Sequence, residues 1–103
     1  MRRQGHTSTI ELVGELDVAA RPALAVASDA ALDSGNVETV VADLAGVTFA
    51  DSSTLGWLVG LDARMKVNGG RLVVFAPQGP VLDLLRITGM DLRLTLVADA
   101  PML

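Results

Sequence analysis

Hydrophobic residues follow two different spacings along the chain, and the first is typical of β-strands. Residues 8–13 and 92–97 alternate between polar and apolar positions, which predicts a first strand and a final strand at an edge of the sheet. Residues 39–44 and 71–76 are apolar runs rich in β-branched side chains, which also predicts strands. Because the run at 39–44 is almost continuously apolar, we expect that strand to be covered on both faces.

The second spacing is helical, and it recurs between the predicted strands. Three segments have it: residues 18–33, 52–67 and 81–87. In the second of these segments, the residues expected to be buried are Leu55, Leu58, Val59 and Met65. The alternation of strands and helices predicts an α/β fold, with a mixed, mostly parallel sheet of four to five strands packed with about three helices.

Length and charge limit what the chain can be. Its 103 residues suffice for one domain, residues 1–103, in which we expect residues 1–7 to be a mobile N-terminus. The formal net charge of −4 disfavours nucleic-acid binding, which requires a basic surface. No apolar run approaches the roughly 18 residues of a membrane span and no signal-peptide pattern is present, so we expect no membrane span and a cytoplasmic location.

Residues suited to catalysis or metal binding are scarce. The chain contains no cysteine, which excludes disulfides and thiol nucleophiles. Its one histidine, His6, lies in the N-terminal segment, so Ser52 and Ser53 have no evident base to activate them. We therefore expect a protein that is not an enzyme and that uses no cofactor and no metal.

Four small polar residues in a row occur where the strand near residue 44 gives way to the helix at 52–67. They are Asp51, Ser52, Ser53 and Thr54. The ordinary interpretation is a helix cap, in which a side-chain oxygen accepts the free N–H groups of the first turn. A cap needs only one or two such groups, which leaves hydroxyls over for another role.

Three residues on the same helix have two interpretations each. Gly56 and Gly60, four residues apart, permit either close packing of the helix on the sheet or close approach of a partner's backbone. Trp57 is either a half-buried core residue or a partner contact, since aromatic residues are enriched at protein interfaces.

These residues resemble a known family. The segments DLAGVTF at residues 43–49 and DSSTLG at residues 51–56 are similar to the signature of STAS domains, and above all to bacterial anti-sigma factor antagonists. GELD at 14–17 and LDLLRITGM at 82–90 match two further motifs, so the resemblance covers roughly residues 8–98. Family members add a short strand at the start and a helix at the C-terminus. This chain has little sequence for either, so we expect the C-terminal helix to be short or absent.

The resemblance implies a phosphorylation switch. The family's phosphoacceptor is the serine directly after the motif's Asp, which is Ser52 here. Ser53 and Thr54 are the alternatives, and Thr54 stands where many members have Gly. The unphosphorylated form would bind an anti-sigma factor with serine-kinase activity and release a sigma factor, and phosphorylation would abolish that binding until a serine phosphatase reversed it. The partner contacts implied or suggested by position are Asp17, Asp51, Ser53, Thr54, Gly56, Trp57 and Leu61.

Two other functions remain open from the sequence. One is a STAS interaction module that is never phosphorylated and docks on a transporter ATPase or a stress-signalling complex. The other is a nucleotide or small-molecule sensor, because α/β sheets often hold ligands at the ends of their strands. Nothing in the sequence indicates an oligomeric state.

Overall fold

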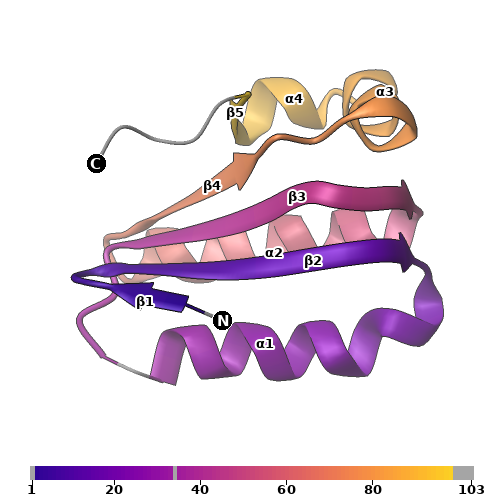
Figure 1. Ribbon diagram of the computed structural model, residues 1–103. Helices are drawn as coiled ribbons and strands as arrows, with labels where there is room; N and C mark the ends of the chain where they lie inside the picture. Colours follow the sequence, from indigo (N-terminus) through magenta and orange to yellow (C-terminus); the bar gives the residue numbers. More distant parts are fainter. Residues whose placement is uncertain (1, 34, 99–103) are drawn as a thin grey trace.

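Strands and helices alternate along the computed structural model, which describes residues 2–33 and 35–98 (Figure 1). The strands are β1 (Arg2–Gln4), β2 (Thr7–Leu16), β3 (Thr39–Ala50), β4 (Arg71–Phe75) and β5 (Thr95–Val97). A 3-10 helix, η1 (Val18–Ala20), leads into α1 (Arg21–Asp33), and the later helices are α2 (Ser52–Val67), α3 (Gly79–Ile87) and α4 (Met90–Arg93).

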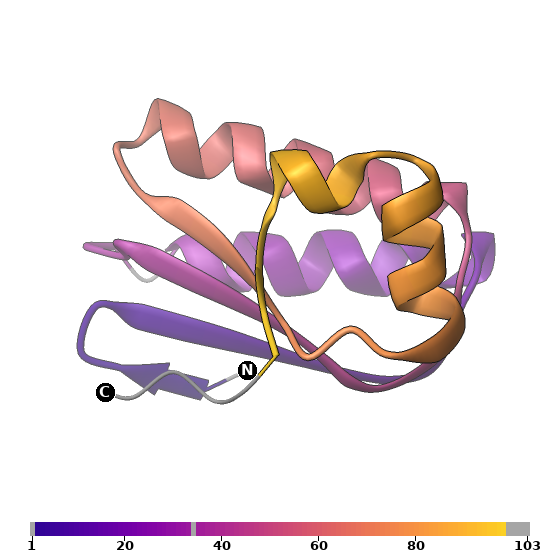
Figure 2. The same ribbon diagram turned by 90° about the horizontal axis from the view of Figure 1, so that it is seen from above.

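The five strands stand in the sheet in the order β1-β2-β3-β4-β5. β1 is antiparallel to β2, and each later strand is parallel to its neighbour. Right-handed crossovers between strands in this sequential order carry every connecting helix to the same face. Figure 2 shows the helices on one side of the sheet. The mixed, mostly parallel sheet is thus confirmed, and the described helices cover one face of β3.

The core lies between the sheet and the helices. Alternate residues of β3 point into it, and Val40, Ala42 and Leu44 are each 0% exposed. Leu58 and Met65 from α2 and Leu85 from α3 fill the helix side of the core. Only 3% of the residues are aromatic, so the core consists mainly of Leu, Val, Ala and Met side chains.

One glycine is required where α2 returns to the sheet. A Cβ on Gly70 would lie 2.7 Å from the carbonyl oxygen of Glu38 and 2.7 Å from Cε of Met65. Backbone and a fully buried side chain cannot both move aside, so only glycine fits this close approach. The preceding Gly69 has φ +75°, the left-handed conformation that commonly ends a helix.

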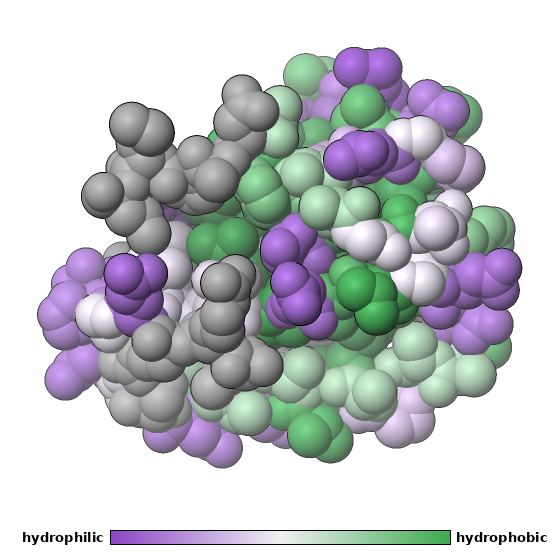
Figure 3. Space-filling view, viewed as in Figure 1, coloured by the Kyte–Doolittle hydropathy of each residue, from purple (hydrophilic) through white to green (hydrophobic). Residues whose placement is uncertain are grey.

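The opposite face of the sheet carries no helix in the described chain. Val41 on β3 and Val73 on β4 are paired neighbours on this face and are only 7% and 5% exposed. Asp43 and Phe75 form the next cross-strand pair on the same face. Figure 3 views the molecule from this side and shows hydrophobic side chains interrupted by hydrophilic ones.

The two ends of the domain differ from the sequence prediction. No strand was predicted before residue 8, yet β1 is present and pairs with Thr7, Ser8 and Thr9 of β2. The predicted final strand begins too early, because Gly89 (φ +76°) ends α3 and the chain enters α4 at once. The alternation of Leu92 and Leu94 therefore arises in a helical turn and its exit, where Leu92 is 88% exposed and Leu94 is buried. The edge position of β5 is confirmed.

Two further expectations concern the C-terminus and membrane spans. A C-terminal helix would fall at residues 99–103, which lie outside the described residues. Among the helices that the structure describes, none combines the length and the apolar character needed to cross a membrane.

Candidate functional site

Two acidic loops leave the sheet next to each other. Leu16, the last residue of β2, is paired with Ala50, the last residue of β3, in a parallel register. The residues that follow, Asp17 and Asp51, therefore begin adjacent loops at the carboxyl edge of the sheet, at the right in Figure 1. This edge is where parallel sheets usually carry their functional groups.

Each aspartate caps the helix that follows it. Asp17 accepts a hydrogen bond from the backbone N–H of Ala19 at 2.9 Å. Asp51 accepts from the N–H groups of Ser53 at 2.9 Å and Thr54 at 3.4 Å, so it is the N-cap of α2. Both residues have the extended backbone typical of an N-cap. The capping interpretation of the sequence is therefore confirmed, and Asp51 is the residue that caps α2.

The carboxylate of Asp51 is held ionised by its neighbours. The Ser53 hydroxyl donates to it at 2.5 Å, and this bond is the main reason that the pKa of Asp51 is lowered. Desolvation opposes the shift, and the backbone N–H groups of Ser53 and Thr54 add to it. The start of α2 thus carries a fixed negative charge beside Ser52.

The three hydroxyls of the motif have different environments. Ser52 is exposed, and within the described chain its hydroxyl takes no part in the cap. Ser53 is partly buried and bonded to Asp51. Thr54 is 1% exposed, and its Oγ1 donates to the carbonyl oxygen of Leu16 at 3.1 Å. Of the three, Ser52 is the hydroxyl that an external enzyme can reach.

The other residues predicted to contact a partner are divided between core and surface. Leu61 is 2% exposed and belongs to the core, so it does not lie on this surface. Trp57 is partly buried, and its indole N–H bonds to α1. Gly56 is exposed, and a Cβ built on it would meet nothing within 4 Å. Packing therefore does not require glycine at position 56.

Two exposed apolar residues at this edge were not singled out from the sequence. Val18, directly after Asp17, is 61% exposed, and Phe49, two residues before Asp51, is 46% exposed. Large apolar side chains exposed beside a functional loop often mark an interface. Their position next to the two aspartates was the available signal, but each also suits a strand end or a helix start.

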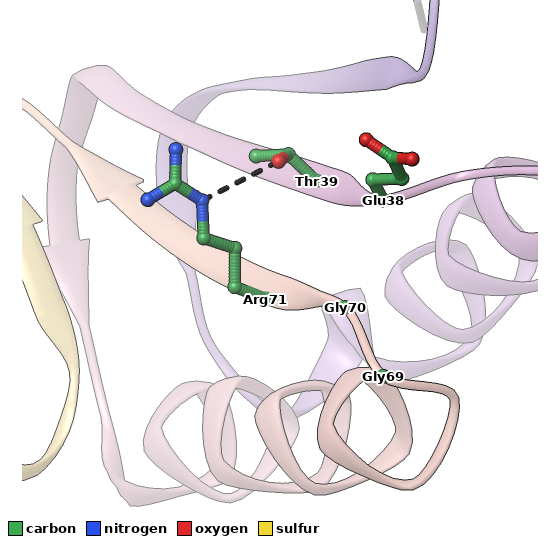
Figure 4. Close-up of a pocket in the computed structure, with 5 residues that line it drawn as sticks. All are labelled: Glu38, Thr39, Gly69, Gly70 and Arg71. Atoms are coloured by element: carbon green, nitrogen blue, oxygen red, sulfur yellow. Dashed lines mark hydrogen bonds between the residues drawn. The ribbon is translucent and has the colours of Figure 1, made fainter.

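A shallow hollow of about 410 Å³ lies at the opposite edge of the sheet. It is lined by Glu38, Thr39, Gly69, Gly70 and Arg71. Figure 4 shows the Arg71 side chain lying over Thr39, where Nε donates to Oγ1 at 3.4 Å. Thr39 and Arg71 are the first residues of β3 and β4, so the hollow is at the amino ends of the strands, away from Ser52. It lies at strand ends, the general place considered for a ligand of a sensor, but at the edge opposite to the loops of Asp17 and Asp51.

With no cysteine in the chain, carboxylates are the main candidates for metal ligands. Across residues 2–33 and 35–98, no group of three or more metal-ligating side chains is placed to hold an ion. Asp17 and Asp51 each accept a backbone N–H as helix caps, which gives both carboxylates a structural role.

Comparisons with known proteins find similarity to STAS domains and to anti-sigma factor antagonists. A family model described as "Mlab, STAS domain" matches residues 1–98. An anti-sigma F factor antagonist from Lysinibacillus sphaericus is 30% identical over 84 residues, which are 82% of this chain and 72% of that protein. The unphosphorylated form of the anti-sigma factor antagonist SpoIIAA has a similar structure, with a TM-score of 0.76 and 23% identity over 98% of this chain and 86% of that one. The phosphorylated form of Bacillus SpoIIAA is also similar, with a TM-score of 0.72 and 23% sequence identity. The match covers 94% of this chain and 87% of that one.

Proposed function

The chain belongs to the STAS domain family, and on this basis we propose that it is an anti-sigma factor antagonist switched by phosphorylation of Ser52. The unphosphorylated protein binds an anti-sigma factor that is also a serine kinase, and a sigma factor is released. One observation carries the proposal. Ser52 is exposed at the first position of α2, while the cap of that helix is supplied by Asp51.

The division of roles between these two residues suits a switch. A phosphate adds about −1.5 to −2 charges and three acceptor oxygens. The N–H groups of Ser53 and Thr54 already bond to Asp51, so a phosphate on Ser52 does not need to replace the cap. The positive end of the helix dipole tolerates the added charge. The fold therefore survives modification, and the effect falls on binding.

Loss of binding follows from desolvation and repulsion. A partner that covers the Asp51 loop has to remove water from the phosphate and accept its charge beside an ionised carboxylate. A cost of about 3 kcal/mol lowers affinity by roughly a hundredfold. A serine phosphatase reaches the same exposed group and restores binding.

The proposed contact surface consists of residues at the carboxyl edge of the sheet. It comprises Asp17, Val18, Phe49, Asp51, Ser52, Ser53 and Gly56, with Trp57 at its margin. The buried side chains of Thr54 and Leu61 are left out of it. ATP binds to the kinase rather than to this chain.

A second candidate is an interaction module that docks on a transporter ATPase or a stress-signalling complex without being phosphorylated. The observation in its favour is that the matching family model is named for Mlab and not for an antagonist. The same surface would serve as the docking site, with Ser52 acting only as a polar contact.

Intact-mass spectrometry after incubation with ATP and candidate anti-sigma kinases separates the two. The antagonist gains one phosphate on the peptide containing Ser52, and Ser52→Ala prevents this while Ser53→Ala does not. Binding is then compared between Ser52→Glu and the neutral, similarly sized Ser52→Gln. Weaker binding by Ser52→Glu alone supports the switch. A stable complex without phosphate transfer, and equal binding by both variants, supports the docking module.

A further inference from the structure

Thr54 makes a contact that joins two segments far apart in the sequence. Its hydroxyl donates to the carbonyl oxygen of Leu16, 38 residues away, at 3.1 Å, and the side chain is 1% exposed. Leu16 is the last residue of β2, directly before Asp17, and Thr54 lies in the first turn of α2, two residues after Ser52. The bond therefore spans the two loops of the proposed contact surface.

The hydrogen bonds of the two helix caps are local. Asp17 holds the N–H of Ala19 within its own loop, and Asp51 holds Ser53 and Thr54 within the other. Such caps fix the shape of each loop but not the position of one loop relative to the other. The Thr54 hydroxyl acts between them, just beyond the last pair of the β2–β3 ladder, Leu16 and Ala50.

We propose that Thr54 is a positioning residue, whose hydroxyl holds the first turn of α2 in register with the end of β2, so that Ser52 and Asp17 face one partner together. The proposal rests on the proposed function of this surface. Burial strengthens the argument, because water does not compete for a bond between groups that are removed from solvent.

The chemistry of threonine fits this role. A helical threonine often turns its Oγ1 back to a carbonyl three or four residues earlier in its own helix. In this structure the hydroxyl bonds instead to the carbonyl of Leu16 on another element. Replacement by valine keeps the branched shape but leaves the Leu16 carbonyl without this donor. Replacement by serine keeps the donor and removes only a methyl group.

The test compares Thr54→Val and Thr54→Ser with the wild-type chain. Amide hydrogen exchange is measured over residues 16–20 and 51–55, and the kinetics of Ser52 phosphorylation by the anti-sigma kinase are measured in parallel. We expect Thr54→Val to exchange about tenfold faster in both loops and to raise KM about tenfold with kcat little changed, since positioning alters recognition. Thr54→Ser should restore both to within about twofold of the wild type.

Ser8→Ala is the matched control, because it removes a buried hydroxyl that donates to the carbonyl oxygen of Ala31 on α1 from the start of β2, at the opposite end of the strand from both loops. If it raises exchange and KM as much as Thr54→Val at a similar loss of melting temperature, Thr54 is merely structural and the proposal is overturned. Wild-type exchange and KM in Thr54→Val also overturn it. If the wild-type chain is neither phosphorylated nor bound, the proposed function fails, and the exchange measurement alone decides whether Thr54 holds the loops together.

Discussion

Trp57 on α2 and Ser28 on α1 share a hydrogen bond in which the indole N–H donates to the Ser28 hydroxyl at 2.5 Å. The same N–H lies 3.1 Å from the carbonyl oxygen of Leu24, and the Ser28 hydroxyl donates to that carbonyl at 3.0 Å. The three groups form a closed network between the two helices. Trp57 therefore has a structural role in the free protein, whatever it contributes to a partner.

This network predicts that Trp57→Phe lowers stability. The substitution keeps an aromatic ring but removes the donor, which should cost about 1–3 kcal/mol in urea unfolding. Ser28→Ala should cost less, because the Leu24 carbonyl still accepts the indole N–H. Affinity for the anti-sigma factor, measured where all the variants are folded, should stay close to the wild-type value. A large loss of affinity without loss of stability would instead assign Trp57 to the interface.

Replacing Gly56 or Gly60 by alanine should raise stability, in contrast to the substitutions at Trp57 and Ser28. Both are exposed within α2, and a Cβ on either would meet nothing within 4 Å. Alanine at each position should raise stability by up to about 1 kcal/mol, because glycine is a poor helix former. Gly70→Ala is the contrasting control and should be destabilising, since its Cβ would contact Glu38 at 2.7 Å.

The same two variants decide between the interpretations of these glycines that the sequence left open. If a partner's backbone approaches α2 closely, Gly56→Ala binds more weakly even though it melts at a higher temperature. If affinity is unchanged, the glycines do not serve the interface. The geometry has already removed the first alternative, close packing on the sheet, because the space around both positions is open.

Asp51 predicts a stability loss in acid. Its pKa in the folded state is lowered, chiefly by the Ser53 hydroxyl, from an ordinary value of 3.8. A carboxyl group of this kind stabilises the fold fully above its unfolded pKa, and the stabilisation is lost as the pH falls through the lower folded value. Urea midpoints of the wild type and Asp51→Asn should therefore differ most above pH 5 and converge towards pH 2. A constant difference across that range would exclude ionisation as the source.

Because Leu61 is buried in the core, its replacement should lower stability. The Leu61 side chain is 2% exposed, so Leu61→Ala should lower the free energy of unfolding by about 2–5 kcal/mol. Leu92→Ala, at a position that is 88% exposed, should change stability by less than about 0.5 kcal/mol. Chemical denaturation of the two variants checks both values. A stable Leu61→Ala variant that binds poorly would return this residue to the contact surface.

The sequence predicted the helix at residues 52–67 without error in its bounds, because Asp51 marks its start and Asn68-Gly69-Gly70 its end. It predicted the buried side chains of this helix in part, because Leu58 and Met65 are buried as expected. Gly56 and Gly60 weaken the amphipathic pattern, so Leu61 was predicted as a partner contact and Val59 as a buried residue, whereas Leu61 is buried and Val59 only partly buried.

The site was predicted in outline from one motif, since local capping chemistry places Asp51 and Ser52 at the start of α2. The role of Thr54 was not predictable, because its partner Leu16 is distant in the sequence and only the parallel pairing of β2 and β3 brings them together. The strand β1 was missed for the same reason. Three polar residues carry little strand signal, and their order comes from pairing with β2.

The strands stand in the sheet in the order in which they occur in the chain, so no later strand has to insert between two earlier ones. During synthesis, at roughly 5–20 residues per second, each strand can join the growing edge as it leaves the ribosome. Ser52 and its supports on β2 and β3 can be in place once α2 has emerged, before β4 and β5 have left the ribosome. A nascent chain can therefore present Ser52, the proposed phosphoacceptor, while part of its core is still missing, which would expose it to the proposed kinase before the domain is finished.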